Sequence, residues 1–316
     1  MNFFSSDAFL ETAAEVFHPG RTHSIEVCRA GGVLLRLLVL DDAQVLQAAP
    51  FYDFPQPLEG PHEGPLREVP YFPRTVLATT TVEARVPEAK GYQPAPFIDW
   101  KRFPSWKDFA AHVEARRARL FDDSRRCRNK LGREVGPLRF VFADERPSVF
   151  EACVRWKSAQ YRASGLPDLF AAPENVALFR GLQARGALVV SSLSAGETLV
   201  AAHLGASWNG RLSWWVPAYD VAFAKASPGR LLLEDLLQAS HALSHAEFDF
   251  LLGDEAYKFH YATHSRVIGP VGVPPLSEQL LAEAKTRVKG VLERYPPALS
   301  WARSVQRALR GTGKPQ

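Results

Sequence analysis

The stretch of residues 214–261 constrains the fold of this chain more than any other. An apolar run leads into a Ser-Pro-Gly-Arg turn at residues 227–230, a leucine-rich helix follows, and a short strand at residues 248–252 ends in a polar Gly-Asp-Glu sequence. A turn that opens a helix presents free backbone N–H groups and the positive end of the helix dipole, which together bind phosphate groups. The order of strand, turn, helix and strand therefore predicts an α/β unit with an anion site where the helix begins.

The rest of the chain alternates between helical and strand-like periodicity. Three strands at residues 187–194, 197–208 and 211–217 follow one another closely, and the Asn-Gly turn between the last two is a strong hairpin signal. Residues 51–73 and 87–96 are rich in proline, which lacks the N–H donor of helices and central strands, so both predict irregular connections. These patterns predict an α/β (α+β) protein with mixed, mostly antiparallel sheets flanked by helices. Further helices are predicted at residues 7–16, 106–120, 124–134, 146–164, 173–185, 255–263, 277–294 and 299–310, and further strands at residues 24–29, 33–40, 45–49, 75–86 and 138–143.

Length and composition narrow the class of protein. The 316 residues suffice for two domains, and no apolar run reaches the roughly 18–20 residues that a membrane span needs. The first residues lack the basic cluster and apolar block of a secretory signal. The three cysteines are far apart, and the histidine pairs 241/245 and 260/264 lack a third ligand, so no metal is expected. We therefore expect a cytoplasmic protein without a membrane span.

The charge pattern allows an anionic ligand. The net charge is +4, and basic residues concentrate at residues 116–133 and 285–314. Solvated helix faces explain both clusters, and a surface for nucleic acid, acidic lipid or another anion is the alternative. Phe121 is the aromatic residue within the first cluster, which is too few for a base-stacking surface, so a nucleic-acid partner is not indicated.

Several motifs resemble one known family. The sequence WKSAQYRASGLPDL at residues 156–169, the pair Tyr219-Asp220, the SPG turn with the leucines after it, and FDFLLGDEAYK at residues 248–258 carry the resemblance. They resemble the GNAT-type acyltransferases of the cellulose-biosynthesis (CelD-like) acetyltransferase family, over about residues 3–265. The chain departs from the usual family pattern at four positions, and the last of them puts the shape of the acceptor pocket in question: Val221, Leu252, Ala256 and Tyr261.

The resemblance implies a fold and an activity. The fold would be two GNAT-like lobes, as in the Fem-type peptidoglycan aminoacyltransferases, with residues 1–125 lacking the cofactor loop and residues 126–270 forming the acyltransferase lobe. Residues 271–316 would be a basic helical tail. The activity would be that of an N-acetyltransferase, with acetyl-CoA or another acyl-CoA as donor. The acceptor would be an amine or hydroxyl of a small molecule or sugar, such as an amino sugar in polysaccharide biosynthesis.

The SPG turn is the implied cofactor loop. In a GNAT fold this loop wraps the cofactor pyrophosphate with backbone amides; glycine allows close approach of the backbone, and basic side chains add charge. An ordinary strand-to-helix connection is the alternative. The residues implied to bind the cofactor are Lys225, Ala226, Ser227, Pro228, Gly229, Arg230 and Leu231.

Acyl transfer from a thioester to an amine needs a base, donors for the oxyanion and stabilisation of the leaving thiolate. The candidate bases are Asp249, Asp254 and Glu255, and Tyr257 is the candidate proton donor because many GNAT enzymes use a tyrosine on the corresponding helix. Each has a structural alternative, such as a helix cap for Asp254 or packing for Tyr257. The predicted catalytic residues are Asp249, Asp254, Tyr257 and Lys258, and the predicted substrate-binding residues are His203, Tyr219, Asp220 and Glu255.

Two other functions stay open at this point. A Fem-type transferase would take its donor from aminoacyl-tRNA, and the cluster at residues 116–133 would hold the tRNA. A non-catalytic GNAT-like binding protein would keep the fold without turnover. In each case the proline-rich loop at residues 51–73 would shape specificity.

Overall fold

The computed structural model describes residues 2–29, 33–40, 51–57, 67–68, 71–83, 91–274 and 276. The chain divides into two compact units, one of Met1–Val69 with Arg74–Pro270 and one of Pro70–Pro73 with Val271–Gln316. The sites discussed below lie in the first unit. The strand predicted at residues 45–49 and the tail helices predicted at residues 277–294 and 299–310 lie outside the described residues.

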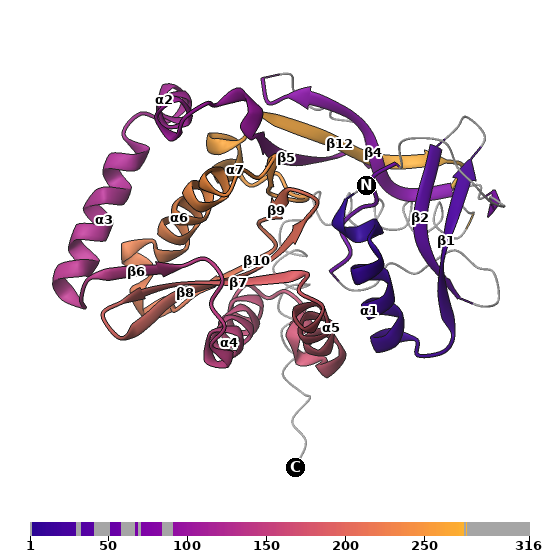
Figure 1. The fold of residues 1–316 in the computed structure, drawn as a ribbon, viewed down its shortest axis with the longest axis horizontal. Coiled ribbons are helices and arrows are strands. Elements are labelled where there is room, and N and C mark those ends of the chain that lie inside the picture. The colour runs from indigo at the N-terminus through magenta and orange to yellow at the C-terminus, as the bar shows by residue number, and fades with distance from the viewer. Residues whose placement is uncertain are drawn as a thin grey trace, which may run out of the picture. The chain divides into compact units, whose positions relative to one another are not determined.

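A large mixed sheet forms the frame of the protein (Figure 1). Its strands pair antiparallel wherever a register is recorded, except that β11 runs parallel to β9. The strand β10 pairs with β8 beside this path. The order across the sheet is β4 (Tyr71–Thr81), β12 (His264–Gly272), β5 (Gln93–Asp99), β11 (Glu247–Asp249), β9 (Arg211–Ser213), β8 (Thr198–Trp208), β7 (Leu188–Ala195) and β6 (Leu138–Val141), with β10 at Val216–Tyr219.

Helices cover both faces of this sheet, which confirms the predicted α/β class. A smaller sheet in the order β2-β1-β3 is formed by β1 (Thr22–Arg29), β2 (Val33–Leu40) and β3 (Arg67–Glu68). No helix within the described ranges is long and apolar enough to span a bilayer. The helices are α1 (Asp7–Phe17), α2 (Trp106–Arg116), α3 (Leu120–Glu134), α4 (Pro147–Ala163), α5 (Pro173–Ala184), α6 (Pro228–Ala242) and α7 (Ala256–Tyr261).

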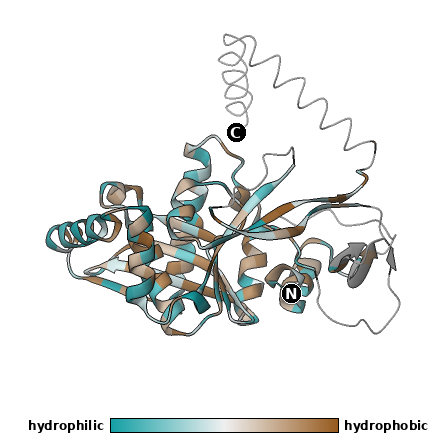
Figure 2. Ribbon diagram, turned by 90° about the horizontal axis from the view of Figure 1, so that it is seen from above, coloured by the Kyte–Doolittle hydropathy of each residue, from teal (hydrophilic) through white to brown (hydrophobic). Residues whose placement is uncertain are grey.

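Two hydrophobic cores lie on opposite faces of β7 and β8. Helix α6 buries its leucine stripe, including Leu232 and Leu236, against one face, and α4 and α5 bury Phe150 and Leu182 against the other. Figure 1 shows α6 on one side of these strands and α4 and α5 on the other, and Figure 2 shows hydrophobic residues along the strands and hydrophilic residues on outer helix surfaces. Each fully buried leucine stabilises the fold by about 1.5–3 kcal/mol, so α6 is fixed firmly on the sheet.

Most predicted elements are confirmed, and local chemistry explains their ends. The Ser6 hydroxyl caps α1 by accepting the Phe9 N–H at 3.2 Å. The Asn209-Gly210 turn joins β8 to β9, and both of its residues have the positive φ that such a hairpin needs. The helix predicted at residues 106–120 ends earlier, at Arg116, because Arg119 adopts a left-handed conformation before α3 begins.

The sequence failed to predict β5 and β12. Pro94 and Pro96 suggested a connector, yet β5 lies between β12 and β11. Both prolines use their carbonyl oxygens, which accept the N–H groups of Gly253 and Phe250 at 3.0 Å, and their missing N–H groups would have faced the same side. On its other side β5 pairs with β12, where Phe97 lies opposite His264 and Ala95 lies opposite Arg266. Proline is therefore tolerated where a strand needs only acceptors on one side.

Both predicted lobes contribute to the same sheet. Strands β4 and β5 come from residues 1–125, and β6 to β12 come from residues 126–272. The boundary between residues 125 and 126 stays a prediction.

Candidate functional site

The site begins where two parallel strands separate. The strand predicted at residues 211–217 is two strands, β9 and β10, interrupted at Trp214 and Trp215. The Trp214 N–H donates to the Asp249 carbonyl at 2.7 Å, beyond the last residue pair between β9 and β11. From there β10 follows β8, whereas the Phe250 N–H turns to β5. The segments that follow β9 and β11 therefore diverge and leave an opening in the sheet.

Two cavities meet at this opening. The first, which we call the helix cavity, has a volume of about 380 Å³ and reaches Gly229 and Arg230 at the start of α6. The second, which we call the loop cavity, has a volume of about 440 Å³ and reaches Asp53 and Arg74. Both are of a size that accepts a small ligand. The residues common to both linings are Lys157, Trp214, Pro217 and Tyr257.

The helix cavity is suited to an anion. The Ser227 carbonyl accepts the N–H groups of Arg230 and Leu231 at 3.0 and 3.2 Å, and Pro228 has no N–H. Gly229 therefore supplies the first-turn N–H without an intrahelical acceptor. The Arg230 Nε is buried without a partner among the described residues. Positive charge from Arg230 thus adds to the positive end of the α6 dipole.

Further basic side chains line the helix cavity. Arg117, from the segment that joins α2 to α3, and His260, from α7, face it together with Lys157. Sequence reasoning did not place Arg117 there, because Arg117 and Gly229 are 112 positions apart in the chain. Arg117 and Lys157, from elements distant in the sequence, therefore add positive charge to that of Arg230.

The predicted cofactor-loop residues divide into two groups. Gly229 and Arg230 line the helix cavity, and so does Tyr219, whose Cδ1 atom would lie 3.3 Å from a Cβ added to Gly229. Lys225 is exposed and does not line it, whereas Ala226 and Leu231 are buried in the core beside α6. The charge that Lys225 was predicted to add is therefore not directed into this cavity. The predicted contact of the loop's backbone amides with a pyrophosphate stays a prediction.

Tyr257 lies where the two cavities join. Its hydroxyl oxygen accepts the indole N–H of Trp214 at 3.0 Å, which leaves the hydroxyl proton available to a ligand. Burial raises the pKa of Tyr257 to about 12, so the hydroxyl is protonated at neutral pH. Tyr257 can therefore donate a hydrogen bond at the junction.

His203 is a core residue rather than a substrate ligand, which corrects the prediction. Its side chain is fully buried, stacks on Trp214 with ring centroids 4.7 Å apart, and accepts the Trp215 N–H on Nε2 at 3.2 Å. Burial lowers the pKa of His203 to about 3, so the ring is neutral. It supports Trp214 from behind and lies out of reach of either cavity.

Lys157 is a site residue that sequence reasoning missed, although it lies in the family-like WKSAQY motif. Helix α4 places its ammonium 3.2 Å from the Pro217 carbonyl and 5.4 Å from the centroid of the Tyr161 ring. Burial lowers the pKa of Lys157. Its one recorded hydrogen bond leaves donors for a ligand at the junction.

The loop cavity contains two carboxylates. Asp53 accepts the Leu252 N–H at 3.1 Å, and burial raises the pKa of Asp53 to about 6 against the lowering effects of that hydrogen bond, of Arg74 and of Lys258. Glu255 is half-exposed and forms an ion pair with Lys258 at 2.9 Å. Asp53 lies in the proline-rich loop at residues 51–73. The sequence predicted that this loop shapes specificity but singled out no residue within it.

Lys258 has a structural task. Its buried ammonium donates to the Leu252 carbonyl at 2.7 Å in addition to the Glu255 carboxylate, so it fixes the chain between β11 and α7. Both contacts place it in the wall of the loop cavity, together with Glu255. Lys258 therefore shapes the site, and two of its three N–H donors are engaged.

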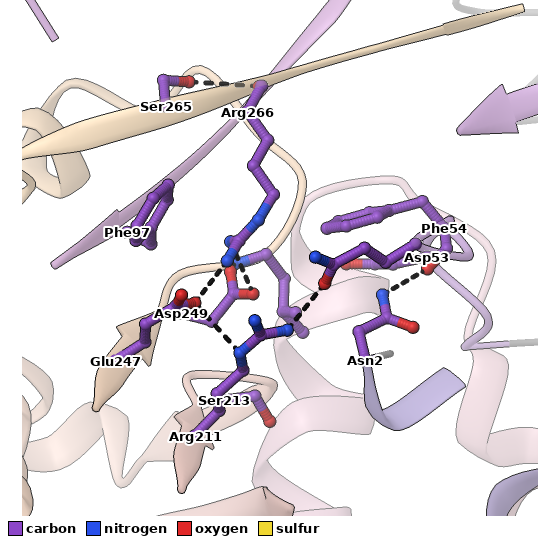
Figure 3. Close-up of polar contacts among 12 residues, drawn as sticks. Asn2, Asp53, Phe54, Phe97, Arg211, Ser213, Glu247, Asp249, Ser265 and Arg266 are labelled. Atoms are coloured by element: carbon purple, nitrogen blue, oxygen red, sulfur yellow. Dashed lines mark hydrogen bonds and ion pairs between the residues drawn. The ribbon is translucent and has the colours of Figure 1, made fainter. Parts of the chain in front are cut away.

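Asp249 does not line either cavity. Its carboxylate accepts from Arg266 Nη1 at 3.0 Å and from the Leu251 N–H at 2.9 Å. Figure 3 shows Arg266 reaching between the Phe97 ring and the carboxylates of Asp249 and Glu247. These residues lie on the sheet face opposite the α6 core, to which Phe248 and Phe250 belong. The prediction of Asp249 as a base is replaced by a role in a buried ion-pair network.

Two other acidic predictions also fall away from the site. Asp254 is exposed and lines neither cavity, and the N-cap of α7 is Glu255, without a side-chain hydrogen bond. Asp220 caps the short 3-10 helix Val221–Ala226 by accepting the Ala222 N–H at 2.9 Å. Within the part of the chain that the structure describes, no group of three metal-ligating side chains occurs.

Comparison with known proteins agrees with this geometry. Residues 116–259 match the model of the acetyltransferase (GNAT) domain. Comparison with curated proteins gave no match. The matched segment contains α4, the splayed strands, α6 and Tyr257, and it stops before β12.

Several solved structures are similar to this chain at low identity. FemX is 9% identical, with 84% of this chain and 91% of that chain covered and a TM-score of 0.50. The C-terminal domain of a putative lysylphosphatidylglycerol synthetase from Agrobacterium fabrum is 9% identical, with coverage of 90% and 94% and a TM-score of 0.48. A tandem GNAT protein from the clavulanic acid pathway is 11% identical, with coverage of 83% and 87% and a TM-score of 0.37. The likeness to FemX concerns the fold alone.

Proposed function

We propose that this protein is an acyl-CoA-dependent acyltransferase that passes the acyl group directly to an amine or hydroxyl acceptor. The observation that carries the proposal is the pair of cavities that meet at Tyr257 and Lys157 within a GNAT-type domain. One cavity has a helix N-terminus and a basic lining for the donor phosphates, and the other has buried carboxylate for the acceptor. Acetyl-CoA is the simplest donor for such a site.

The donor would bind in the helix cavity. The Gly229 N–H and the Arg230 and Arg117 guanidinium groups would contact its pyrophosphate, because charge-assisted hydrogen bonds to phosphate are strong. The thioester would then reach the junction at Trp214. This assignment retains two residues of the predicted cofactor loop and adds Arg117.

The reaction follows from the groups at the junction. The acceptor amine attacks the thioester carbonyl carbon; a C–N bond forms, the C–S bond breaks, and Asp53 takes the proton that the amine loses. The Lys157 ammonium would stabilise the carbonyl oxygen as it gains negative charge. A tyrosine with a pKa of about 12 is a weaker acid than a thiol, whose pKa is about 8.5. Tyr257 would therefore donate a hydrogen bond to the leaving thiolate more readily than it would transfer its proton to it.

The fold likeness to FemX makes an aminoacyl-tRNA donor the second candidate. The basic cluster that would hold tRNA, however, is largely engaged in ion pairs. Recorded pairs in it are Arg116–Glu83, Arg125–Asp122, Arg126–Asp123, Arg128–Asp235 and Lys130–Glu134. Compensated charges release few counterions from a nucleic acid, so this surface favours the acyl-CoA donor.

Thermal unfolding in the presence of acetyl-CoA tests the proposal. A ligand at a hundred times its Kd adds about 2.7 kcal/mol of stability, so Tm should rise. Gly229→Glu places a carboxylate in the helix cavity and should abolish the rise; Gly132→Glu, on α3 where an added Cβ meets only ordinary contact, should keep it. Arg117→Glu is a second variant that leaves α6 intact.

Two results would change the assignment. If neither acetyl-CoA nor a longer acyl-CoA shifts Tm of the wild-type protein, the donor proposal fails. If instead charged tRNA retards the protein in a mobility assay and Arg125→Glu removes the retardation, the second candidate takes its place. Acetyl-CoA binding without thiol release in the presence of any amine would favour a non-catalytic binding protein.

A further inference from the structure

We infer that the acceptor carries an acidic group, a carboxylate or a phosphate, in the same small molecule as its reacting amine, and that Arg74 binds that group. The inference rests on the proposed transfer reaction and names the class of acceptor. It comes from the charges that line the loop cavity and from the contacts that they lack.

The guanidinium group of Arg74 lies in the cavity wall and has few hydrogen-bond partners. It is half-buried and has five N–H donors, yet the hydrogen bond recorded for it among the described residues is from Nη2 to the Tyr52 carbonyl at 3.4 Å. Arg128 and Arg266, by contrast, are paired with Asp235 and Asp249. An arginine that faces a cavity without a carboxylate partner is suited to bidentate recognition of a ligand carboxylate or phosphate.

The neighbouring acid does not neutralise Arg74. Asp53 lines the same cavity, and both residues are described, but no ion pair joins them. The Asp53 carboxylate instead accepts a hydrogen bond from the Leu252 N–H. Burial raises the pKa of Asp53 more than Arg74 lowers it, as expected for charges that are near each other without direct contact.

The remaining charges leave the cavity positive. Glu255 and Lys258 form an ion pair and offset each other. The remaining charged residues of the lining are Asp53, Arg74 and Lys157. The single negative charge of Asp53 offsets only one of the two positive charges. An acceptor whose only charged group is an amine is a cation in water, and the excess positive charge of the lining would repel it. An acceptor that also has an acid group would not be repelled in this way.

The arrangement matches a molecule with both charges. The amino group of the acceptor would lie beside Asp53, and the acid group would lie at Arg74. The cavity volume of about 440 Å³ suits an amino acid or an amino-sugar phosphate and excludes a long polymer from full enclosure. Tyr161 and Trp215 add flat walls against which such a small molecule can pack.

The test compares acceptors that differ in the acid group alone. Release of CoA thiol from acetyl-CoA is measured with amino acids against their amides, and with glucosamine 6-phosphate against glucosamine. We expect kcat/KM to be roughly 10- to 100-fold higher for the acidic member of at least one pair, as for loss of a charge-assisted hydrogen bond. The pair that shows the difference tells a carboxylate acceptor from a phosphate acceptor.

Variants connect the difference to Arg74. Arg74→Gln should remove the advantage of the acidic acceptor through a higher KM for that acceptor; Arg74→Lys should restore part of it. Arg139→Gln, on the exposed position of β6, is the matched control and should change neither. Equal rates on acidic and neutral acceptors, or an equal loss on both in Arg74→Gln, would overturn the inference.

Binding of the acceptor alone separates this inference from the donor proposal. If acidic amines raise Tm of the wild-type protein but not of Arg74→Gln, while no acyl-CoA binds, the acceptor class stands and the donor is wrong. If acetyl-CoA binds but no acidic amine raises Tm or is acylated, the donor stands and the acceptor class is wrong.

Discussion

Replacing Asp249 by asparagine separates a structural role from a catalytic one. The Asp249 side chain is 8% exposed and its partner Arg266 is 4% exposed, so the contact between them is shielded from solvent. Asparagine has nearly the same volume and keeps an oxygen for the Leu251 N–H. The Asp249→Asn substitution therefore removes little more than the charge that faces Arg266.

The expected loss follows from that one contact. A hydrogen bond between charged groups contributes about 1.5–3 kcal/mol. Removing one partner of a buried ion pair costs about 3–5 kcal/mol where it strands the other charge, but Arg266 keeps Glu247 as a second partner. We therefore expect a loss of about 2–3 kcal/mol, or a Tm lower by roughly 4–6 °C at about 2 °C per kcal/mol for a unit of this size.

The assay combines denaturant unfolding with thiol release by the folded enzyme. A general base contributes about 10²–10⁴-fold to the rate, whereas the position of Asp249 outside both cavities predicts a kcat/KM within about threefold of wild type. Glu145→Gln, at an exposed position before α4, should change stability by less than about 0.5 kcal/mol. An Asp249→Asn protein with unchanged Tm and a rate lowered more than a hundredfold would refute the structural reading and restore Asp249 as the base.

Two further predictions concern the junction and the loop cavity. Tyr257→Phe should lower kcat roughly 10- to 100-fold through the lost hydrogen bond to the thiolate and leave the binding of acetyl-CoA unchanged in a thermal-shift assay; a lower affinity with normal kcat would contradict it. Asp53→Asn should abolish the rise of kcat/KM with pH near 6 that the raised pKa of Asp53 predicts in the wild type. Burial favours the protonated form of Asp53, so the free energy of unfolding of the wild type, relative to that of Asp53→Asn, should fall by about 1–3 kcal/mol as pH rises from 4 to 7.5. Urea unfolding at the two pH values measures this difference. An increase with pH would contradict the assignment.

Local sequence determined the elements around Gly229 and Arg230 in the helix cavity. The SPG turn and the leucine stripe after it fix where α6 begins and which of its faces is buried, because a turn residue and a helical period act within a few positions of the chain. The Asn-Gly turn fixes the hairpin of β8 and β9 for the same reason. These segments also carry the family-like motifs, so Gly229, Arg230 and Tyr257 could be predicted before the fold was known.

The lining of the loop cavity was decided by tertiary structure. Asp53, Arg74 and Lys157 come from a loop, a strand and a helix, and no local pattern says that they line one cavity. Asp249 shows the same limit: strand alternation places it opposite Phe248 and Phe250, but only the packing of α6 on one face decides which side holds the site. Periodicity fixes the direction of a side chain relative to its own element, whereas its neighbours depend on strand pairing between residues far apart in the chain.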